Sequence, residues 1–136
     1  KVEPAAYQAM YALEKYLSSS KIEPILLELI KMRASQLNGC AFCLNMHSAD
    51  ARKIGETEQR LYLLNAWTET TLFTAREKAV LALTEAVTHI ENHVSDEIYN
   101  NVASFFEEKE VAQLIIAIAT INAWNRIAIT SRLIVS

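Results

Sequence analysis

Apolar residues recur at helical spacing along most of this 136-residue chain. In the first stretch, Ala6, Met10, Leu13 and Leu17 follow Pro4 at intervals of three or four residues. This spacing places them on one face of an α-helix. Six further stretches are expected to be helical: 24–37, 40–53, 58–67, 76–90, 95–107 and 109–133. The pattern predicts an all-α fold, a compact helical bundle of about six to seven helices.

Capping and breaking residues support these boundaries. Pro24 suits the first turn of the second helix, and Asn38-Gly39 separates that helix from the third. Gly55 is placed to follow the end of the third helix, and Thr57 to cap the short helix after it. The segment Thr74–Glu77 has the form of a capping box, which opens the next helix.

The last predicted helix is apolar over much of its circumference. Such a helix lies either at the centre of a domain or at a subunit interface. Its uncharged run, Val111 to Asn125, is too short to span a bilayer, so no membrane partner is expected.

Composition narrows the class of protein. Apolar residues make up 51% of the chain, and it contains only two glycines and two prolines, which disfavours a β-rich fold with many turns. The net charge of -3 gives no basic surface for nucleic acid. Residues 1–20 lack the apolar core of a signal peptide. We expect a single domain over 1–136 and a cytoplasmic location.

The chain's two cysteines lie in the stretch NGCAFCLNMHSADARK, residues 38–53. On a helix, Cys40, Cys43 and His47 stand at i, i+3 and i+7 and share one face, with His47 one turn beyond Cys43. The start of a helix favours a thiolate, and two cysteines at this spacing can close a disulfide. The pattern therefore favours redox chemistry, with a thiolate, a base and a resolving thiol.

Two other interpretations of these residues stay open. The cysteines could be small core side chains beside a structural histidine. They could also be ligands of zinc together with His47, but structural zinc requires four ligands. His89 and His93, spaced i, i+4, could contribute, although they fit better near the end of a helix. We expect no bound metal.

The region around the cysteines resembles a known family. The stretch LLELIKMRASQLNGCAFCLNMHSADARKIGETEQRLYLLNAW, residues 26–67, is similar to the alkylhydroperoxidase D-like branch of the carboxymuconolactone decarboxylase family. FTAREKAVLALTEAVT and the late INAWNR, residues 121–126, fit the same family. The resemblance implies an all-α protein that forms homo-oligomers, trimers or hexamers, and that reduces peroxides.

The resemblance also implies roles for individual residues. Cys43 would attack the peroxide and Cys40 would resolve the resulting sulfenic acid to a disulfide. His47 would be the base, and Glu28 would orient and charge His47. A carboxylate in the apolar run ILLELI needs a partner when buried, which agrees with this pairing. The well-studied members carry a histidine where this chain has Phe42, so their lipoyl-protein reductant is not assumed here.

Residues outside the dithiol helix receive less weight. Phe42, Met46 and Trp67 could wall an apolar pocket, although such residues at helical spacing more often belong to the core. The residues of the late motif are expected to form a structural or interface cluster, with Arg126 paired to a carboxylate; they are Asn122, Trp124, Asn125 and Arg126.

The expected function is a cofactor-free, thiol-dependent peroxidase of antioxidant defence, with a peroxide and an external thiol reductant as its reaction partners. A general thiol–disulfide oxidoreductase and a non-catalytic redox-sensing oligomer are the alternatives. The dithiol argues against lactone decarboxylation, because the decarboxylase branch of the family lacks it.

Overall fold

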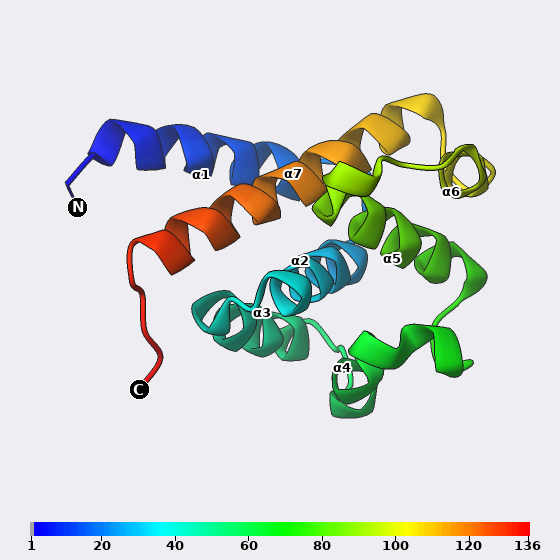
Figure 1. The fold of residues 1–136 in the computed structure, drawn as a ribbon, viewed down its shortest axis with the longest axis horizontal. Helices are drawn as coiled ribbons and strands as arrows, with labels where there is room; N and C mark the ends of the chain where they lie inside the picture. The colour runs from blue at the N-terminus through cyan, green and yellow to red at the C-terminus, as the bar shows by residue number, and fades with distance from the viewer. Residues whose placement is uncertain (1) are drawn as a thin grey trace.

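The computed structural model describes residues 2–136. Over these residues the chain forms seven α-helices, two short 3₁₀ helices and no strand (Figure 1). The predicted all-α class is therefore confirmed. The α-helices are α1 (Pro4–Ser18), α2 (Pro24–Asn38), α3 (Ala41–Lys53), α4 (Glu58–Leu63), α5 (Ala75–Thr88), α6 (Asp96–Ala103) and α7 (Glu108–Thr130). The 3₁₀ helices are η1 (Leu64–Glu69) and η2 (Ile90–Asn92).

Most of the predicted caps are present. Gly39 ends α2 in the left-handed conformation, with a φ of 68°, which glycine adopts without strain. The hydroxyl of Thr57 accepts a hydrogen bond from the backbone N–H of Arg60. Thr74 and Glu77 form the expected capping box of α5. These side chains satisfy backbone N–H groups that the first turn of a helix leaves unpaired.

Three helix ends differ from the prediction. The predicted helix over 58–67 divides into α4 and η1 after Leu63, which has a φ of -98° and a ψ of 3°, and the non-helical φ and ψ of Ala66 place a kink within η1. The helix predicted over 95–107 ends at Ala103, and Glu107 is instead the N-cap residue of α7: its backbone N–H donates to the Oε1 of Glu110 at 2.9 Å. At the other end of α7, Arg132 has a positive φ of 64°, which turns the chain out of the helix.

The helix α2 is the centre of the bundle. It packs against α3, α5 and α7, while α1 packs mainly on α7. Most of the apolar side chains of α2 are buried, and Leu29 and Ile30 are completely so. The dithiol helix α3 is therefore fixed on one side by the most buried element of the protein.

Of the described helices, only α7 is long and apolar enough to cross a membrane by length and composition. It has 23 residues, eight more than the uncharged run within it. Of its most apolar 18-residue stretch, 44% is buried in the protein. Because α7 packs against α1, α2, α3, α5 and α6, it is the long core helix of the bundle.

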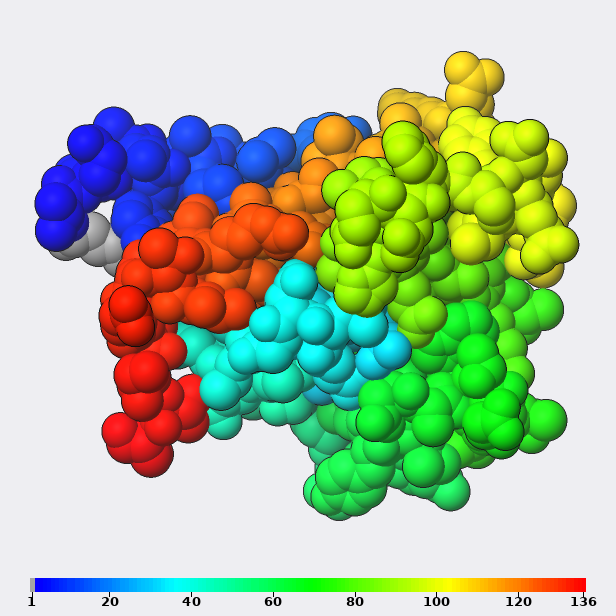
Figure 2. All heavy atoms as spheres, in the orientation of Figure 1, coloured from blue at the N-terminus to red at the C-terminus, as the bar shows by residue number. Residues whose placement is uncertain are grey.

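The two ends of the described chain lie at the same end of the molecule (Figure 1). There, α1 packs against α7, and the segment after α7 turns away from the direction of the helix (Figure 2). The short helix α6 lies at the opposite end of the molecule. The residues described below gather near the chain ends, between α1, α3 and the last turns of α7.

Candidate functional site: a dithiol helix beside an aromatic cavity

The turn between α2 and α3 positions the two cysteines. Gly39 reverses the chain, and the backbone N–H of Cys40 donates to the carbonyl of Ser35 at 3.0 Å. Cys40 is the N-cap residue of α3 rather than part of its first turn, and its sulfur accepts from the N–H of Cys43 at 3.3 Å. Both sulfur atoms thus lie at the positive end of the helix dipole.

Cys40 and Cys43 are joined in a disulfide, with their Cα atoms 5.3 Å apart. Both side chains are buried, at 1% and 2% exposure. Their surroundings nevertheless differ, because Cys43 lines a cavity of about 330 Å³ and Cys40 is absent from its wall. A small molecule in this cavity would meet Cys43 first.

His47 and Glu28 are brought together as the resemblance implied. The Nδ1 of His47 lies 3.2 Å from the Oε1 of Glu28, within hydrogen-bond distance. His47 is buried on α3, and Glu28 reaches it from the neighbouring helix α2. When Nδ1 carries a proton and donates it to Glu28, Nε2 is the ring atom left to accept a proton. His47 lines the same cavity as Cys43.

Glu28 has a second partner that was not expected from the sequence. The Nζ of Lys31 lies 3.5 Å from the Oε2 of Glu28 and 3.2 Å from the Oε1 of Glu14 on α1. The other oxygen of Glu14 accepts a hydrogen bond from the indole Nε1 of Trp124 at 3.0 Å. A continuous polar chain therefore runs from His47 through Glu28, Lys31 and Glu14 to Trp124.

The cavity beside Cys43 has a largely aromatic and apolar wall. The rings of Tyr7 and Tyr11 are tilted against that of Trp124, with centroids 6.0 and 5.6 Å away. Phe42 and Met46 of α3 add to the wall, in agreement with one of the two interpretations considered for them. Trp67 is elsewhere: its indole donates to the Oε2 of Glu85 at 2.7 Å, and its ring packs on the core.

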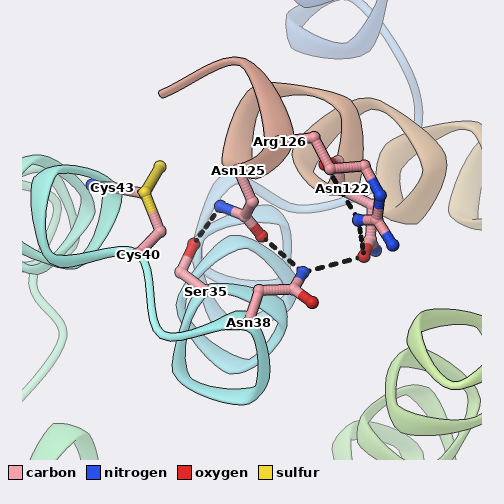
Figure 3. Close-up of a disulfide and its surroundings, with 7 residues drawn as sticks. All are labelled: Ser35, Asn38, Cys40, Cys43, Asn122, Asn125 and Arg126. Carbon is pink, nitrogen blue, oxygen red and sulfur yellow. Dashed lines mark hydrogen bonds between the residues drawn. A yellow bond between two sulfur atoms is a disulfide. The ribbon is translucent and has the colours of Figure 1, made fainter. Parts of the chain in front are cut away.

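Two residues of the late motif, Asn122 and Asn125, belong to a partly buried polar cluster beside the cysteines (Figure 3). The side-chain amide of Asn38 donates to the amide oxygens of Asn122 and Asn125, at 2.9 Å in both cases. Asn125 in turn donates to the hydroxyl of Ser35 at 3.0 Å. The predicted pairing of Arg126 with a carboxylate is wrong. Its guanidinium instead donates to the backbone and side-chain oxygens of Asn122, one turn earlier on the same helix.

The possible metal ligands that lie close together are not the set considered for zinc, which was Cys40, Cys43 and His47. In this oxidised state Cys40 and Cys43 offer no thiolates. Ligand atoms of Glu28, His47 and Asp50 lie within 4.8 Å of one another, but the ammonium of Lys31 stands beside Glu28. A cation there would compete with Lys31 for the same carboxylate.

Several residues of the site were missed from the sequence, although a signal was present. Tyr7, Tyr11 and Glu14 stand at i, i+4 and i+7 on α1, and so share the face that α1 turns to the cavity. Lys31 and Asp50 stand three residues beyond Glu28 and His47, one helical turn away in each case. Pairing of α1 with α7 is a tertiary contact that local spacing does not reveal.

Comparisons with known proteins identify the family of this chain. The model of the family "Carboxymuconolactone decarboxylase" matches residues 4–86. The uncharacterized protein YdfG of Bacillus subtilis (strain 168) is 46% identical over 129 residues, which cover 94% of this chain and 88% of YdfG.

Solved structures share the fold. A protein of unknown function from Agrobacterium tumefaciens, for which a role as the antioxidant defence protein AhpD has been suggested, superposes with a TM-score of 0.92. It is 41% identical, over 95% of this chain and 89% of that one. The debrominase Bmp8 has a TM-score of 0.81 at 19% identity, over 96% of this chain and 70% of its own, and shows the fold alone. The chain belongs to the carboxymuconolactone decarboxylase family, and its solved neighbours include AhpD-like proteins.

Proposed function

We propose that this protein is a thiol-dependent peroxidase of antioxidant defence, which reduces hydrogen peroxide or organic hydroperoxides through a Cys40/Cys43 dithiol–disulfide cycle. One observation carries the proposal: Cys43, already paired with Cys40, lines a cavity together with His47, and His47 is held by Glu28. The suggested antioxidant role of the Agrobacterium relative supports it.

The proposed cycle balances in three steps. The thiolate of Cys43 attacks one peroxide oxygen, the O–O bond breaks, and the alcohol or water leaves with a proton from the His47 imidazolium. Cys43 is now a sulfenic acid. The thiol of Cys40 attacks its sulfur, the S–O bond breaks, water leaves and the disulfide forms. An external dithiol then reduces the disulfide and is itself oxidised.

The division of labour between the cysteines follows the cavity. Cys43 is reached through the cavity, whereas Cys40 lies behind it at the N-cap of α3. His47 stands one helical turn after Cys43 and can take the thiol proton, while the charge of Glu28 stabilises the imidazolium that results. We therefore assign attack to Cys43, resolution to Cys40, and proton transfer to His47 with Glu28 as its positioning residue.

The proposal extends to the state of the protein. It acts without a bound cofactor, as a single domain, in the cytoplasm and as a trimer or hexamer. Exposed apolar side chains on the long core helix, Ile115 and Ile116, support subunit contacts through α7. The cytoplasmic location is proposed from the cysteine spacing. Two cysteines three apart suit a redox cycle in a reducing compartment better than a structural disulfide of a secreted protein.

The test is peroxide consumption by purified protein with a panel of reductants. Cys43→Ser should abolish turnover. Cys40→Ser should react once and stop as a sulfenic acid, which mass spectrometry after trapping with dimedone detects. Ala41→Ser, an exposed change between the two cysteines, is the matched control and should keep turnover. Full turnover by Cys43→Ser would overturn the assignment.

The same assay separates the alternatives. Reduction of a protein or small disulfide without peroxide consumption would favour a general thiol–disulfide oxidoreductase. A disulfide that forms and changes the oligomeric state, without turnover of either substrate, would favour a redox sensor.

A further inference from the structure

The aromatic cavity is much larger than hydrogen peroxide requires. Its volume is about 330 Å³, whereas one water molecule occupies roughly 30 Å³ of the liquid. A site for hydrogen peroxide alone would need space for little more than the two oxygen atoms. The remaining volume is available to an organic substituent, and the side chains around it determine which kind.

Aromatic rings from two helices form one side of this space. Tyr7 and Tyr11 come from α1 and Trp124 from α7, with their planes tilted by 39° and 37° against the indole. Tyr11 is still 52% exposed, so the packing of these rings leaves it accessible. Flat apolar groups bind such walls by stacking and by burial of apolar surface.

The polar side of the cavity carries an excess of negative charge. Glu14 and Asp50 line it, and Glu28 lies behind them. Against these three carboxylates stand Lys31, which is shared between Glu14 and Glu28, and the exposed Lys53 of the adjoining hollow. Asp50 is the carboxylate left without a lysine, 4.0 Å from the Nδ1 of His47. Proton transfer from Cys43 to His47 creates a thiolate and an imidazolium together and leaves this net charge unchanged, so an anion entering the cavity meets an excess of negative charge in either state.

We infer that the cavity binds uncharged molecules with a flat apolar body, that Tyr11 and Trp124 provide this preference, and that Asp50 repels anions. That the substrate is a hydroperoxide rests on the proposed function. The preferred peroxide is then a neutral aromatic hydroperoxide, and fatty-acid or other carboxylate-bearing hydroperoxides are poor substrates. Tyr11, Trp124 and Asp50 are specificity-determining residues in this scheme.

The charge preference can be measured without any peroxide. In reduced Cys40→Ser protein, Cys43 is the single thiol, and it is alkylated with neutral iodoacetamide or with anionic iodoacetate. We expect the ratio of the iodoacetate rate to the iodoacetamide rate to be about tenfold lower than in the same protein unfolded in urea, from like-charge repulsion at close range. Added salt should raise the ratio, because salt screens the repulsion.

Charge-removing variants locate the effect. Asp50→Asn should raise the ratio towards the unfolded value. Glu97→Gln, which removes an exposed carboxylate from α6 at the far end of the molecule, should leave it unchanged (Figure 1). A ratio equal to or above that of the unfolded protein would overturn the inference. So would an equal effect of both variants, or a folded protein that reacts with neither reagent.

The aromatic preference has its own measurement. 2-Phenyl-2-propanol should slow the alkylation of Cys43 by iodoacetamide, and its ring-carboxylated analogue should not. Tyr11→Ala should weaken this protection; in turnover it should raise KM for cumene hydroperoxide by a larger factor than KM for hydrogen peroxide. Equal protection by both alcohols, or none by either, would overturn the inference. Protection without any peroxide turnover would instead reject the proposed function and retain this site.

Discussion

At the scale of single residues, Glu28 stands between two partners. One oxygen faces the Nδ1 of His47, and the other faces the Nζ of Lys31. The two contacts explain how a carboxylate is accommodated within the apolar run of α2, where an unpaired charge would be costly. The contact with Lys31 also fixes the orientation of the Glu28 carboxylate, and this carboxylate in turn orients the ring of His47. Glu28 is thus placed to act through His47.

Glu28→Gln should slow thiol chemistry at Cys43 without removing the cavity. The neutral amide can still fill the space but no longer stabilises an imidazolium, so the thiolate appears at higher pH. We expect alkylation of Cys43 at neutral pH to be roughly tenfold slower, which corresponds to about 1.4 kcal/mol. The measurement is the rate of alkylation against pH in Cys40→Ser protein. Glu58→Gln, an exposed carboxylate on α4, is the control; an unchanged pH profile for Glu28→Gln would remove Glu28 from the proton relay.

Phe42 shows how one departure from the family pattern changes a site. The family's well-studied members carry a histidine at this position, and here the side chain is an apolar ring on the cavity wall, 37% exposed. A ring there adds apolar surface next to Cys43 and removes a group that could carry protons. In the proposed cycle, His47 is the histidine that serves Cys43, and the Phe42 ring adds apolar surface to the proposed binding site.

At the scale of elements, the end of α2 is tied to α7 by amide side chains. Asn38 donates to Asn122 and Asn125, and Asn125 donates to Ser35, so that the last turn of α2 is held to α7 at its beginning and at its end (Figure 3). Cys40 follows within two residues of Asn38, and its N–H is bonded to the carbonyl of Ser35. The cluster therefore helps to fix the backbone position of Cys40 at the N-cap of α3.

Asn125→Ala should loosen this turn. Asn125 is fully buried, and its removal leaves the hydroxyl of Ser35 without its amide donor, so we expect a loss of about 1–3 kcal/mol in the free energy of unfolding. The disulfide should also become easier to reduce, because the thiols are held together less firmly. Urea unfolding and equilibration with dithiothreitol measure the two effects. Asn101→Ala, an exposed amide of α6, is the control; a variant with lower stability but an unchanged disulfide equilibrium would contradict the positioning role.

Local chemistry made some of these elements predictable and left others hidden. The capping box at Thr74 and the left-handed Gly39 are local, so the starts of α5 and α3 follow from the sequence. The pairing of Cys40 with Cys43 is equally local. By contrast, Trp124 reaches Glu14 across 110 positions of the chain. The aromatic wall of the cavity depends on such long-range contacts, which cannot be predicted from the spacing of residues or from capping motifs.

At the scale of the whole molecule, two arginines clamp α5 to the rest of the bundle. Arg60 of α4 donates to both oxygens of Glu77 and to the buried Glu56, and its guanidinium lies over the ring of Phe73. On the other side, Arg76 pairs with Glu23 at the start of α2. The hydrogen bonds from Arg76 hold the pKa of Glu23 below its ordinary value, against the effect of burial.

Glu77 makes this clamp sensitive to acid. Burial raises the pKa of Glu77, but hydrogen bonds from Arg60 and from the backbone of Thr74 outweigh burial, so its pKa in the folded protein lies below the ordinary value of 4.5. A carboxyl group of lowered pKa stabilises the fold above that ordinary value, and the stabilisation is lost as the pH falls through the folded pKa. Unfolding should therefore become easier as the pH falls below 4.5.

Glu77→Gln tests this link between charge and fold. At neutral pH the variant should be less stable than the wild type by about 2 kcal/mol, the scale of hydrogen bonds to charged groups. As the pH falls below 4.5, protonation of Glu77 removes the same interactions from the wild type, and the difference should shrink. Thermal or urea unfolding across the pH range measures it, with Glu97→Gln as the exposed control on α6. A constant difference at every pH would mean that the charge of Glu77 contributes nothing and that its side chain acts through its neutral contacts alone.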